Sequence, residues 1–280
     1  MIRLAAIYWD PKPEIFVLPI VKWPILWYGV IFAIGFAVGF PIFVSILTRF
    51  LGKGEKKKAV VIADRLTIYM ILGTVIGARV GHFLFYEHPA NYLRDPFEVF
   101  RIWEGGLASH GAVVGIVLAL ILFSYRIRPV EPKLTPICLL DFVCVPTAFA
   151  AFCIRIGNFI NQEILGTPTH LPWAVVFGHP ADRSIPIPRH PVQIYEAIFY
   201  LAVFFLLWRL SFFRSFLFIR GKLIGLFLVL VFGFRFFVEF LKTEQSHLMS
   251  ASSLTMGQIL SIPVFVAGFI LFFWKSKDSQ

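Results

Sequence analysis

Long apolar runs separated by short polar connections dominate the pattern of this chain. A helix needs about 20 mostly apolar residues to cross the hydrocarbon core of a bilayer. The third run is the shortest, and residues 105–109 are expected to extend it. The pattern therefore predicts an all-α integral membrane protein with seven transmembrane helices. The seven runs are residues 25–48, 60–86, 110–125, 135–158, 192–210, 223–242 and 255–274.

Composition supports a membrane protein and excludes other classes. Hydrophobic residues make up 58% of the 280 residues, charged residues only 15%, and Phe alone occurs 33 times. A soluble fold needs more polar cover, and disordered chains are poor in apolar and aromatic residues. The net charge of +10 could indicate nucleic-acid binding. However, Lys and Arg form short clusters between the apolar runs, as topology signals do, so we expect no nucleic-acid partner.

The distribution of basic residues predicts the orientation of the chain. Fourteen Lys and Arg residues lie in the connections 49–58, 126–133 and 209–222 and in the tail 275–277, whereas the opposite side carries eight. Because cytoplasmic loops are enriched in Lys and Arg, the C-terminus is predicted in the cytoplasm and the N-terminus outside. The resulting organisation is an extracytoplasmic arm (1–24), helices one to four (25–158), an outer loop (159–191), helices five to seven (192–274) and a cytoplasmic tail (275–280).

Prolines shape the two outer segments. Residues 1–24 contain four prolines among aromatic and β-branched residues, which predicts an extended arm at the membrane surface. These prolines also argue against a cleaved signal peptide. Residues 159–191 contain six prolines, which forbid a long helix there. Within this Pro-rich loop, residues 173–177 are expected to form a strand.

Small residues predict a closely packed bundle. Gly73, Gly77 and Gly81 lie on one face of the second span, and Gly111 and Gly115 lie on one face of the third. Glycines at this spacing let helix backbones approach closely within a bilayer. The pattern is common in membrane proteins and indicates packing without indicating chemistry.

Motifs for several kinds of chemistry are missing. The sequence contains no HExxH, G-x-S-x-G or P-loop motif and no paired carboxylates on one helix face. We therefore expect no metal, no cofactor and no covalent enzyme nucleophile; an enzyme of this kind would position two substrates and move a proton. The cysteines lack disulfide or zinc spacing and are expected to be buried free thiols: Cys138, Cys144 and Cys153.

Ionisable residues inside the apolar runs carry the chemical information, because each must find a partner or costs several kcal/mol. Under the predicted topology, Arg79, Arg155 and Arg235 fall in the outer halves of their spans. Arg235 lies about seven residues before the end of its span, roughly 10 Å deep. Tyr28 and His110 begin spans on the same side. An Arg guanidinium holds phosphate in a forked geometry, so this layer predicts binding of an outer-leaflet phospholipid head group.

Structural alternatives exist for these residues. Arg235 could simply pair with Glu239, four residues later on the same helix. No acid lies within a turn of Arg155, which favours a ligand there. His110, flanked by glycines, could be an interfacial cap or could accept a proton. Two aspartates near the middle or inner half of their spans are expected to satisfy buried helix contacts: Asp64 and Asp141.

Six sequence blocks follow one another over nearly the whole chain. They are Leu26-Trp27-Tyr28-Gly29; Gly105-Gly106-Leu107-Ala108-Ser109-His110-Gly111; Arg155-Ile156-Gly157-Asn158-Phe159-Ile160-Asn161-Gln162-Glu163 with Gly166; Arg189-His190-Pro191-Val192-Gln193-Ile194-Tyr195-Glu196; Phe234-Arg235-Phe236-Phe237-Val238-Glu239; and Thr255-Met256-Gly257-Gln258. Together they resemble the bacterial prolipoprotein diacylglyceryl transferase family. The second and third blocks are highly specific.

The resemblance implies a seven-spanning enzyme of the bacterial inner membrane, with its active site toward the outer leaflet and without a cofactor. Its substrates would be phosphatidylglycerol and preprolipoproteins, and membrane lipids would surround it. The thiol of the lipobox cysteine would attack the glyceryl carbon bonded to phosphate, and glycerol phosphate would depart. The arm and the Pro-rich loop would cover the peptide substrate.

The resemblance also implies residue roles. Arg155 and Arg235 would neutralise the phosphate as it leaves, and His110 would help to deprotonate the thiol. The remaining residues would orient the head group and the backbone: Tyr28, Asn158, Asn161, Glu163, Gly166 and Glu239. Three positions depart from the family pattern, namely Val231 for a frequent Tyr, Thr167 for a frequent Arg and Lys242 for a usual Arg.

Two other classes of protein would also keep arginines in the membrane. A lipid transporter or flippase with an outer-leaflet phosphate site should place polar groups through the bilayer depth or near its midplane. An alcohol phosphatidyltransferase would need clustered aspartates for a metal, which the sequence lacks. Transfer of a labelled diacylglyceryl group to a lipobox peptide separates the three.

Overall fold

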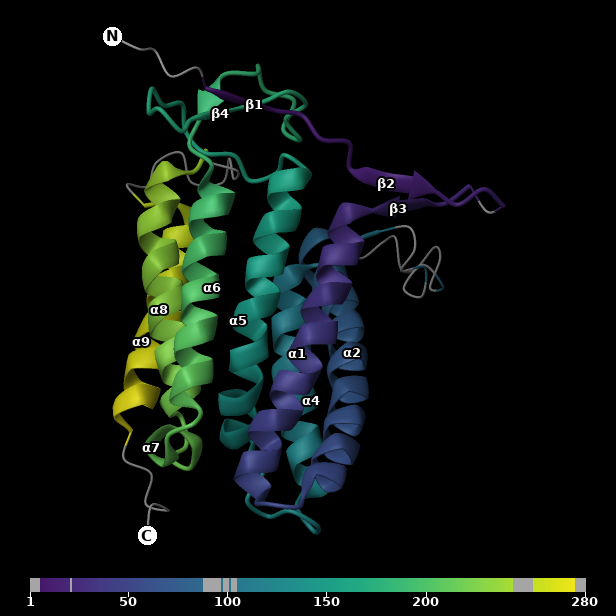
Figure 1. Ribbon diagram of the computed structural model, residues 1–280, viewed down its shortest axis with the longest axis vertical. Coiled ribbons are helices and arrows are strands. Elements are labelled where there is room, and N and C mark those ends of the chain that lie inside the picture. Colours follow the sequence, from purple (N-terminus) through teal and green to yellow (C-terminus); the bar gives the residue numbers. More distant parts are fainter. Residues whose placement is uncertain are drawn as a thin grey trace. The chain divides into compact units, whose positions relative to one another are not determined.

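Seven helices long and apolar enough to cross a membrane occur in the part of the chain that the computed structural model describes (Figure 1). That part comprises residues 6–20, 22–87, 97, 101, 105–243 and 254–274. All seven spans predicted from the apolar pattern are confirmed. They are α1 (Trp27–Leu51), α2 (Lys56–Tyr86), α4 (Ser109–Ile127), α5 (Pro136–Ile160), α6 (Val192–Leu210), α8 (Lys222–Val238) and α9 (Met256–Phe273). A short helix, α7 (Arg214–Leu217), precedes α8, and a 3-10 turn, η3 (Glu239–Leu241), continues it.

The start of the third span differs from the sequence prediction. Helix α4 begins at Ser109, and residues 105–108 are not helical. Gly105 and Gly106 have φ angles of 92° and 73°, which lie outside the right-handed helical region. The expected extension of this span through residues 105–108 is therefore wrong. Two consecutive glycines with positive φ prevent the helix from starting at residue 105.

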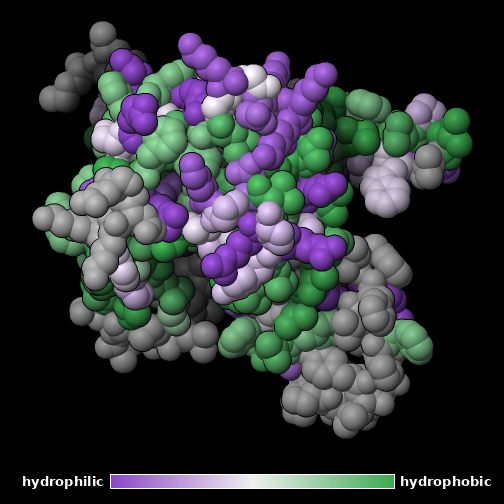
Figure 2. All heavy atoms as spheres, turned by 90° about the horizontal axis from the view of Figure 1, so that it is seen from below, coloured by the Kyte–Doolittle hydropathy of each residue, from purple (hydrophilic) through white to green (hydrophobic). Residues whose placement is uncertain are grey.

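The chain divides into two compact units, one of residues 1–46 and 141–280 and one of residues 47–140. In the second unit, α2 and α4 pack through their glycines, as the spacing predicted. A Cβ atom on Gly77 would lie 2.8 Å from Gly115 Cα, and one on Gly81 would lie 2.7 Å from Gly111 Cα. At the opposite end of this unit, the Lys58 ammonium forms an ion pair with Glu131. Figure 2 shows hydrophilic side chains gathered over that end.

The first unit contains α5, α6, α8, α9 and most of α1. Asp141 on α5 caps the start of α8: its two carboxylate oxygens accept hydrogen bonds from the backbone N–H of Gly221 at 2.6 Å and of Ile224 at 2.8 Å. The predicted buried helix contact of Asp141 is therefore confirmed. The same prediction for Asp64 is wrong, because its side chain is exposed on α2, on a face away from the buried Ala63. The three cysteines of α5 are buried and free, as expected.

The N-terminal arm is extended, as its prolines indicated. Its strands are β1 (Ile7–Trp9), β2 (Glu14–Val17) and β3 (Pro24–Leu26), and the outer loop adds β4 (Val175–Phe177) and β5 (Pro188–Arg189). Strand β1 pairs in parallel with β4, which lies within the strand predicted at residues 173–177, and β2 pairs with β3. Trp9 stacks on Phe159 with 4.6 Å between ring centroids and donates its indole N–H to the Phe159 carbonyl at 3.0 Å. This small sheet therefore fastens the arm and the loop to the end of α5.

Candidate functional site

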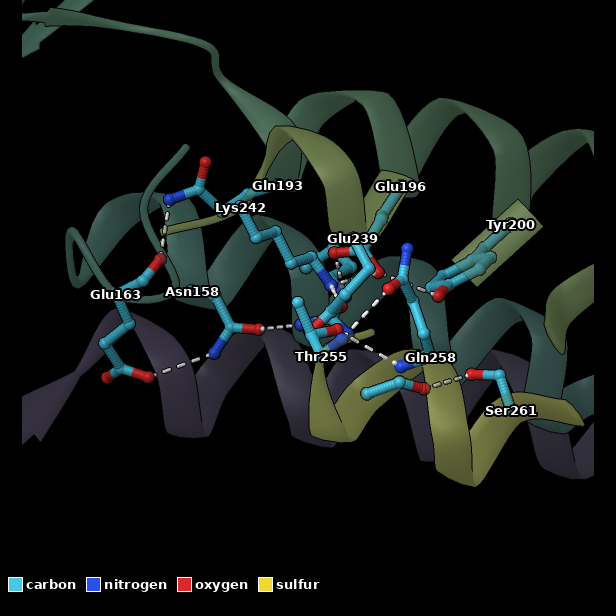
Figure 3. Close-up of polar contacts among 12 residues, drawn as sticks. Asn158, Glu163, Gln193, Glu196, Tyr200, Glu239, Lys242, Thr255, Gln258 and Ser261 are labelled. Atoms are coloured by element: carbon cyan, nitrogen blue, oxygen red, sulfur yellow. Dashed lines mark hydrogen bonds and ion pairs between the residues drawn. The ribbon is translucent and has the colours of Figure 1, made fainter. Parts of the chain in front are cut away.

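Polar side chains from several helices meet at one end of the first unit (Figure 3). They come from the last turns of α5, the first turns of α6, the end of α8 with η3, and the first turn of α9. The sequence predicted a polar layer on one side of the spans. Three members of that layer, Tyr28, Arg155 and Arg235, belong to the first unit and lie at this end of it.

Glu196, on α6, lies at the centre of a buried ion network. Its side chain is 0% exposed. One carboxylate oxygen forms an ion pair with Arg155 Nε at 3.0 Å. The other accepts from Lys242 Nζ at 3.0 Å and from the Tyr200 hydroxyl at 3.1 Å. A buried carboxylate persists only when it is paired and hydrogen-bonded. Glu196 therefore fixes the positions of two cations from two other segments of the chain.

A second chain of hydrogen bonds runs from Arg155 toward the outer loop. Arg155 Nη1 donates to Asn158 Oδ1 at 3.1 Å, and Asn158 Nδ2 donates to Glu163 at 3.0 Å. Asn161 Nδ2 donates to the other oxygen of Glu163 at 2.8 Å, and Gln193 donates to the Glu163 backbone carbonyl at 2.6 Å. Four residues predicted from the sequence are thus brought together. Among the described residues, Nη2 of Arg155 has no hydrogen-bond partner, so this edge of the guanidinium remains open.

The side chain of Arg235 differs from that of Arg155 in having no hydrogen bond or ion pair among the described residues. The alternative pairing with Glu239 is not formed there; Glu239 instead pairs with Lys242 at 3.3 Å. Burial lowers the pKa of Lys242, with Glu196 and Glu239 opposing the effect and Arg155 and Arg235 adding to it. Arg235 is therefore a half-buried cation close enough to act on the network without a described counter-ion.

Tyr28, at the start of α1, belongs to the same cluster. A Cβ atom on Gly157 would lie 2.6 Å from the Tyr28 ring, so the glycine lets the ring lie directly against α5. The structure thus places Tyr28 against the turn of α5 that carries Arg155 and Asn158.

Gly166 occupies a tight position in the outer loop. Its carbonyl accepts hydrogen bonds from Arg189 Nη1 and from the Thr243 hydroxyl, both at 3.1 Å. A Cβ atom here would lie 2.8 Å from the His190 Cβ and would also clash with the His190 carbonyl. Close packing alone therefore accounts for glycine at this position, and the predicted contact with substrate stays a prediction.

His110 belongs to the second unit and is exposed at the start of α4. Its ring lies 5.7 Å from that of Tyr86. Arg79, which the sequence placed in the same polar layer, is buried and donates to the carbonyls of Gly105 and Gly106 at 2.6 and 3.1 Å. Arg79 thus holds the loop that leads into His110. The proximity of His110 to the Arg155 cluster stays a prediction.

The network contains residues that sequence reasoning did not assign to the site. Glu196 supplies Arg155 with the acid that the search within one helical turn did not find, because the acid comes from another helix. A signal was present, since Gln193, Glu196 and Tyr200 share one face of an otherwise apolar span. Polar residues at this spacing inside a membrane helix indicate a functional or buried partner on a neighbouring helix.

The fold and this site define a multi-pass α-helical membrane protein with a charged network built into the ends of its spans. The family model described as prolipoprotein diacylglyceryl transferase matches residues 15–274. The chain therefore belongs to the prolipoprotein diacylglyceryl transferase family, a family of transferases in lipoprotein biosynthesis, as the six sequence blocks predicted.

Similar proteins named phosphatidylglycerol–prolipoprotein diacylglyceryl transferase occur in several bacteria. The protein of Chloroherpeton thalassium is 42% identical, over 98% of this chain and 96% of its own length. That of Tolumonas auensis is 40% identical, over 97% and 98%. That of Chlamydia caviae is 39% identical, over 100% and 97%.

The three departures from the family pattern have different structural consequences. Lys242 keeps a cation on Glu196 and Glu239, so the ion network survives the change from Arg. Thr167 donates its backbone N–H to the Leu241 carbonyl at 2.8 Å, a bond that any residue except proline can make. Val231 is buried and offers no hydroxyl. A role for a tyrosine hydroxyl at position 231 is therefore not available to this chain.

Proposed function

We propose that this chain transfers the diacylglyceryl group of phosphatidylglycerol to the thiol of the lipobox cysteine of preprolipoproteins and releases glycerol phosphate. The names of the relatives supply the donor, the acceptor and the group transferred. The observation that carries the assignment of the site is a pair of arginines, one bonded within the charged network and one without a counter-ion on the helix that ends at it. Arg155 is held by Glu196 and Asn158, and Arg235 has no counter-ion among the described residues.

The reaction forms one bond and breaks one. The sulfur of the thiolate attacks the glyceryl carbon bonded to phosphate, and the bond from this carbon to the phosphate oxygen breaks. The electron pair stays on the phosphate oxygen, so negative charge grows on the leaving glycerol phosphate. Arg155 and Arg235 stabilise this charge, since a guanidinium binds phosphate with a planar pair of donors. His110 accepts the proton of the thiol.

The residues around Arg155 hold its guanidinium in place before the substrate binds. Glu196 and Asn158 fix the guanidinium before the lipid binds, so less reorganisation accompanies the growth of charge. Asn161 Oδ1 has no hydrogen-bond partner among the described residues and is available to a hydroxyl of the glycerol head group. Four further residues line and position the site: Tyr28, Glu163, Gly166 and Glu239.

The proposed location is the outer leaflet of the bacterial inner membrane, with the N-terminus outside. In the first unit, the basic connection between α6 and α8 lies at the opposite end of these helices from the charged network. That connection carries Arg214 and Arg220 and is followed by Lys222 at the start of α8. Since cytoplasmic connections are enriched in Lys and Arg, this arrangement supports a network that faces outward.

The test is transfer by the purified full-length chain in vesicles that contain phosphatidylglycerol labelled in its diacylglyceryl part. A lipobox peptide should acquire the label in a thioether, with an equal amount of glycerol phosphate released. Arg235→Gln should lower kcat/KM by roughly 10²-fold or more, as removal of a charge-stabilising donor typically does. Arg209→Gln is the matched control, because Arg209 is exposed at the other end of α6. Lipid movement between leaflets without a labelled peptide would support the flippase alternative instead.

A further inference from the structure

The imidazole of His110 lies in the first turn of α4 and makes no hydrogen bond or ion pair among the described residues. A free ring nitrogen suits a group that accepts a proton. A catalytic base is commonly oriented by a third group hydrogen-bonded to it, and no such group contacts His110 in the described part of the chain. The torsion that turns a histidine ring has only a broad preference of its own. Contacts with neighbouring rings are what remains to fix its plane.

Two aromatic rings at the end of α2 contact this imidazole. The Phe85 ring meets it edge to face, with 5.2 Å between centroids and 75° between planes. The Tyr86 ring lies 5.7 Å away and is inclined by 38°. Both distances fall within the range of attractive aromatic pairs. Because the two rings make different angles with the imidazole of His110, together they restrict its rotation.

Tyr86 is itself held by a neighbour. His82, one turn earlier on α2, stacks on it with 5.7 Å between centroids and 14° between planes. His82 Nε2 lies 3.3 Å from the Glu87 carboxylate. A Cβ atom on Gly106 would lie 2.8 Å from the His82 ring, so this ring also lies against the loop that leads into His110. The Tyr86 ring therefore stacks on a side chain that is fixed at two points.

These ring contacts are not part of a buried core. Phe85 is 70% exposed and Tyr86 is 67% exposed. Helices α2 and α4 already approach closely through their glycines, as the contact of Gly77 with Gly115 shows. The Tyr86 hydroxyl makes no hydrogen bond among the described residues. The fold of this unit thus gains little from the Tyr86 ring, and its described contacts are with the two imidazoles.

We infer that Tyr86 is a positioning residue for His110; the inference rests on the proposed function. Its ring holds the imidazole in the orientation in which a ring nitrogen accepts the proton of the substrate thiol. The proton moves from sulfur to nitrogen, and the electron pair stays on the sulfur, which then attacks the glyceryl carbon. Only the ring of Tyr86 is needed for this role, because its hydroxyl contacts neither imidazole.

The test combines changes at Tyr86 with a change at His110. Tyr86→Ala removes the ring, and Tyr86→Phe keeps the ring without the hydroxyl. Tyr125→Ala is the matched control, because Tyr125 is 65% exposed on α4 of the same unit and makes no ring contact or hydrogen bond among the described residues. Each variant is made in the wild-type chain and in His110→Asn. The full-length chains are assayed in phosphatidylglycerol vesicles for kcat and for KM, and thermal unfolding is measured in parallel.

Tyr86→Ala should lower kcat by about tenfold and leave the KM values for lipid and peptide unchanged, since misorientation costs less than the 10²–10⁴-fold that a general base contributes. Tyr86→Phe should stay near the wild-type rate. In His110→Asn, the change Tyr86→Ala should have no further effect, because residues that act as a unit are not additive. At high pH the tenfold loss should shrink, as the substrate thiol ionises unaided.

Several results would overturn the inference. An equal loss in Tyr86→Phe would assign the effect to the hydroxyl, and a further tenfold loss in His110→Asn would separate Tyr86 from His110. A wild-type rate in Tyr86→Ala, or a thermal stability well below that of Tyr125→Ala, would also contradict it. Full activity of His110→Asn would overturn the role proposed for His110 and this inference with it. Failure of the wild-type chain to modify any peptide would instead overturn the proposed function.

Discussion

Replacement of Arg155 by lysine separates the geometry of the cation from its charge. The guanidinium contacts Glu196 through Nε at 3.0 Å and Asn158 through Nη1 at 3.1 Å, and its Nη2 edge remains open among the described residues. A lysine ammonium is a single point of charge on a flexible stem. It can keep the ion pair with Glu196, but it cannot hold Asn158 and a phosphate oxygen in the same plane.

The expected magnitude follows from the hydrogen bonds that a lysine cannot make. One charge-assisted hydrogen bond contributes about 1.5–3 kcal/mol, which corresponds to roughly 10–150-fold in rate when it acts in the transition state. Arg155→Ala loses the same hydrogen bonds; it also leaves Glu196 with one cation fewer, and breaking a buried pair costs about 3–5 kcal/mol of folding stability, which affects thermal unfolding and not the rate of the folded protein. We therefore expect kcat/KM to fall about 10²-fold for Arg155→Lys and only moderately further for Arg155→Ala.

The assay is transfer of labelled diacylglyceryl to a lipobox peptide, with thermal unfolding measured in parallel. Arg209→Lys serves as control, since the side chain of this exposed arginine lies over the Phe213 ring and makes no hydrogen bond or ion pair among the described residues. Near-normal transfer by Arg155→Lys would refute the reasoning, because charge alone would then suffice. A large loss of thermal stability in Arg155→Lys would assign the arginine to the fold and not to the phosphate.

Other perturbations test separate parts of the molecule. His110→Asn should retain phosphatidylglycerol binding but slow thioether formation by about 10²–10⁴-fold, with partial rescue at high pH as the substrate thiol ionises unaided. Replacing the three cysteines of α5 by Ser should keep transfer activity and lower stability; lost turnover in a folded variant would indicate an enzyme thiol. Gly115→Val should lower the free energy of unfolding by about 1–3 kcal/mol through overpacking against α2, whereas Gly29→Ala, with no atom within 4 Å of its Cβ, should not. The hydrogen bond with His179 lowers the pKa of Asp10 below 3.8, so amide protection in β1 and β4 should be full above that pH and fall as pH drops through the lowered pKa; Asp10→Asn should remove this dependence.

Local sequence patterns were enough to predict the seven spans and the end of the spans at which polar residues gather. Both follow from local properties, because about 20 contiguous apolar residues suffice to cross a bilayer whatever they pack against. Glycine spacing likewise identified the faces of α2 and α4 that meet. The outer segments were predicted to be extended for a local reason too, since proline excludes a long helix.

The partners of the charged residues were decided by the tertiary structure. Arg155 meets Glu196 from another helix, and Glu239 pairs with Lys242 instead of Arg235. The parallel pairing of β1 with β4 joins segments that lie far apart in the sequence of the first unit. Each of these contacts depends on how helices and loops rotate and pack against one another. The apolar pattern shows which face of a helix is buried, but this face is wide and leaves the rotation of the helix loosely defined. An ion pair requires the two charged atoms to lie within about 4 Å of each other, so the pattern cannot predict it.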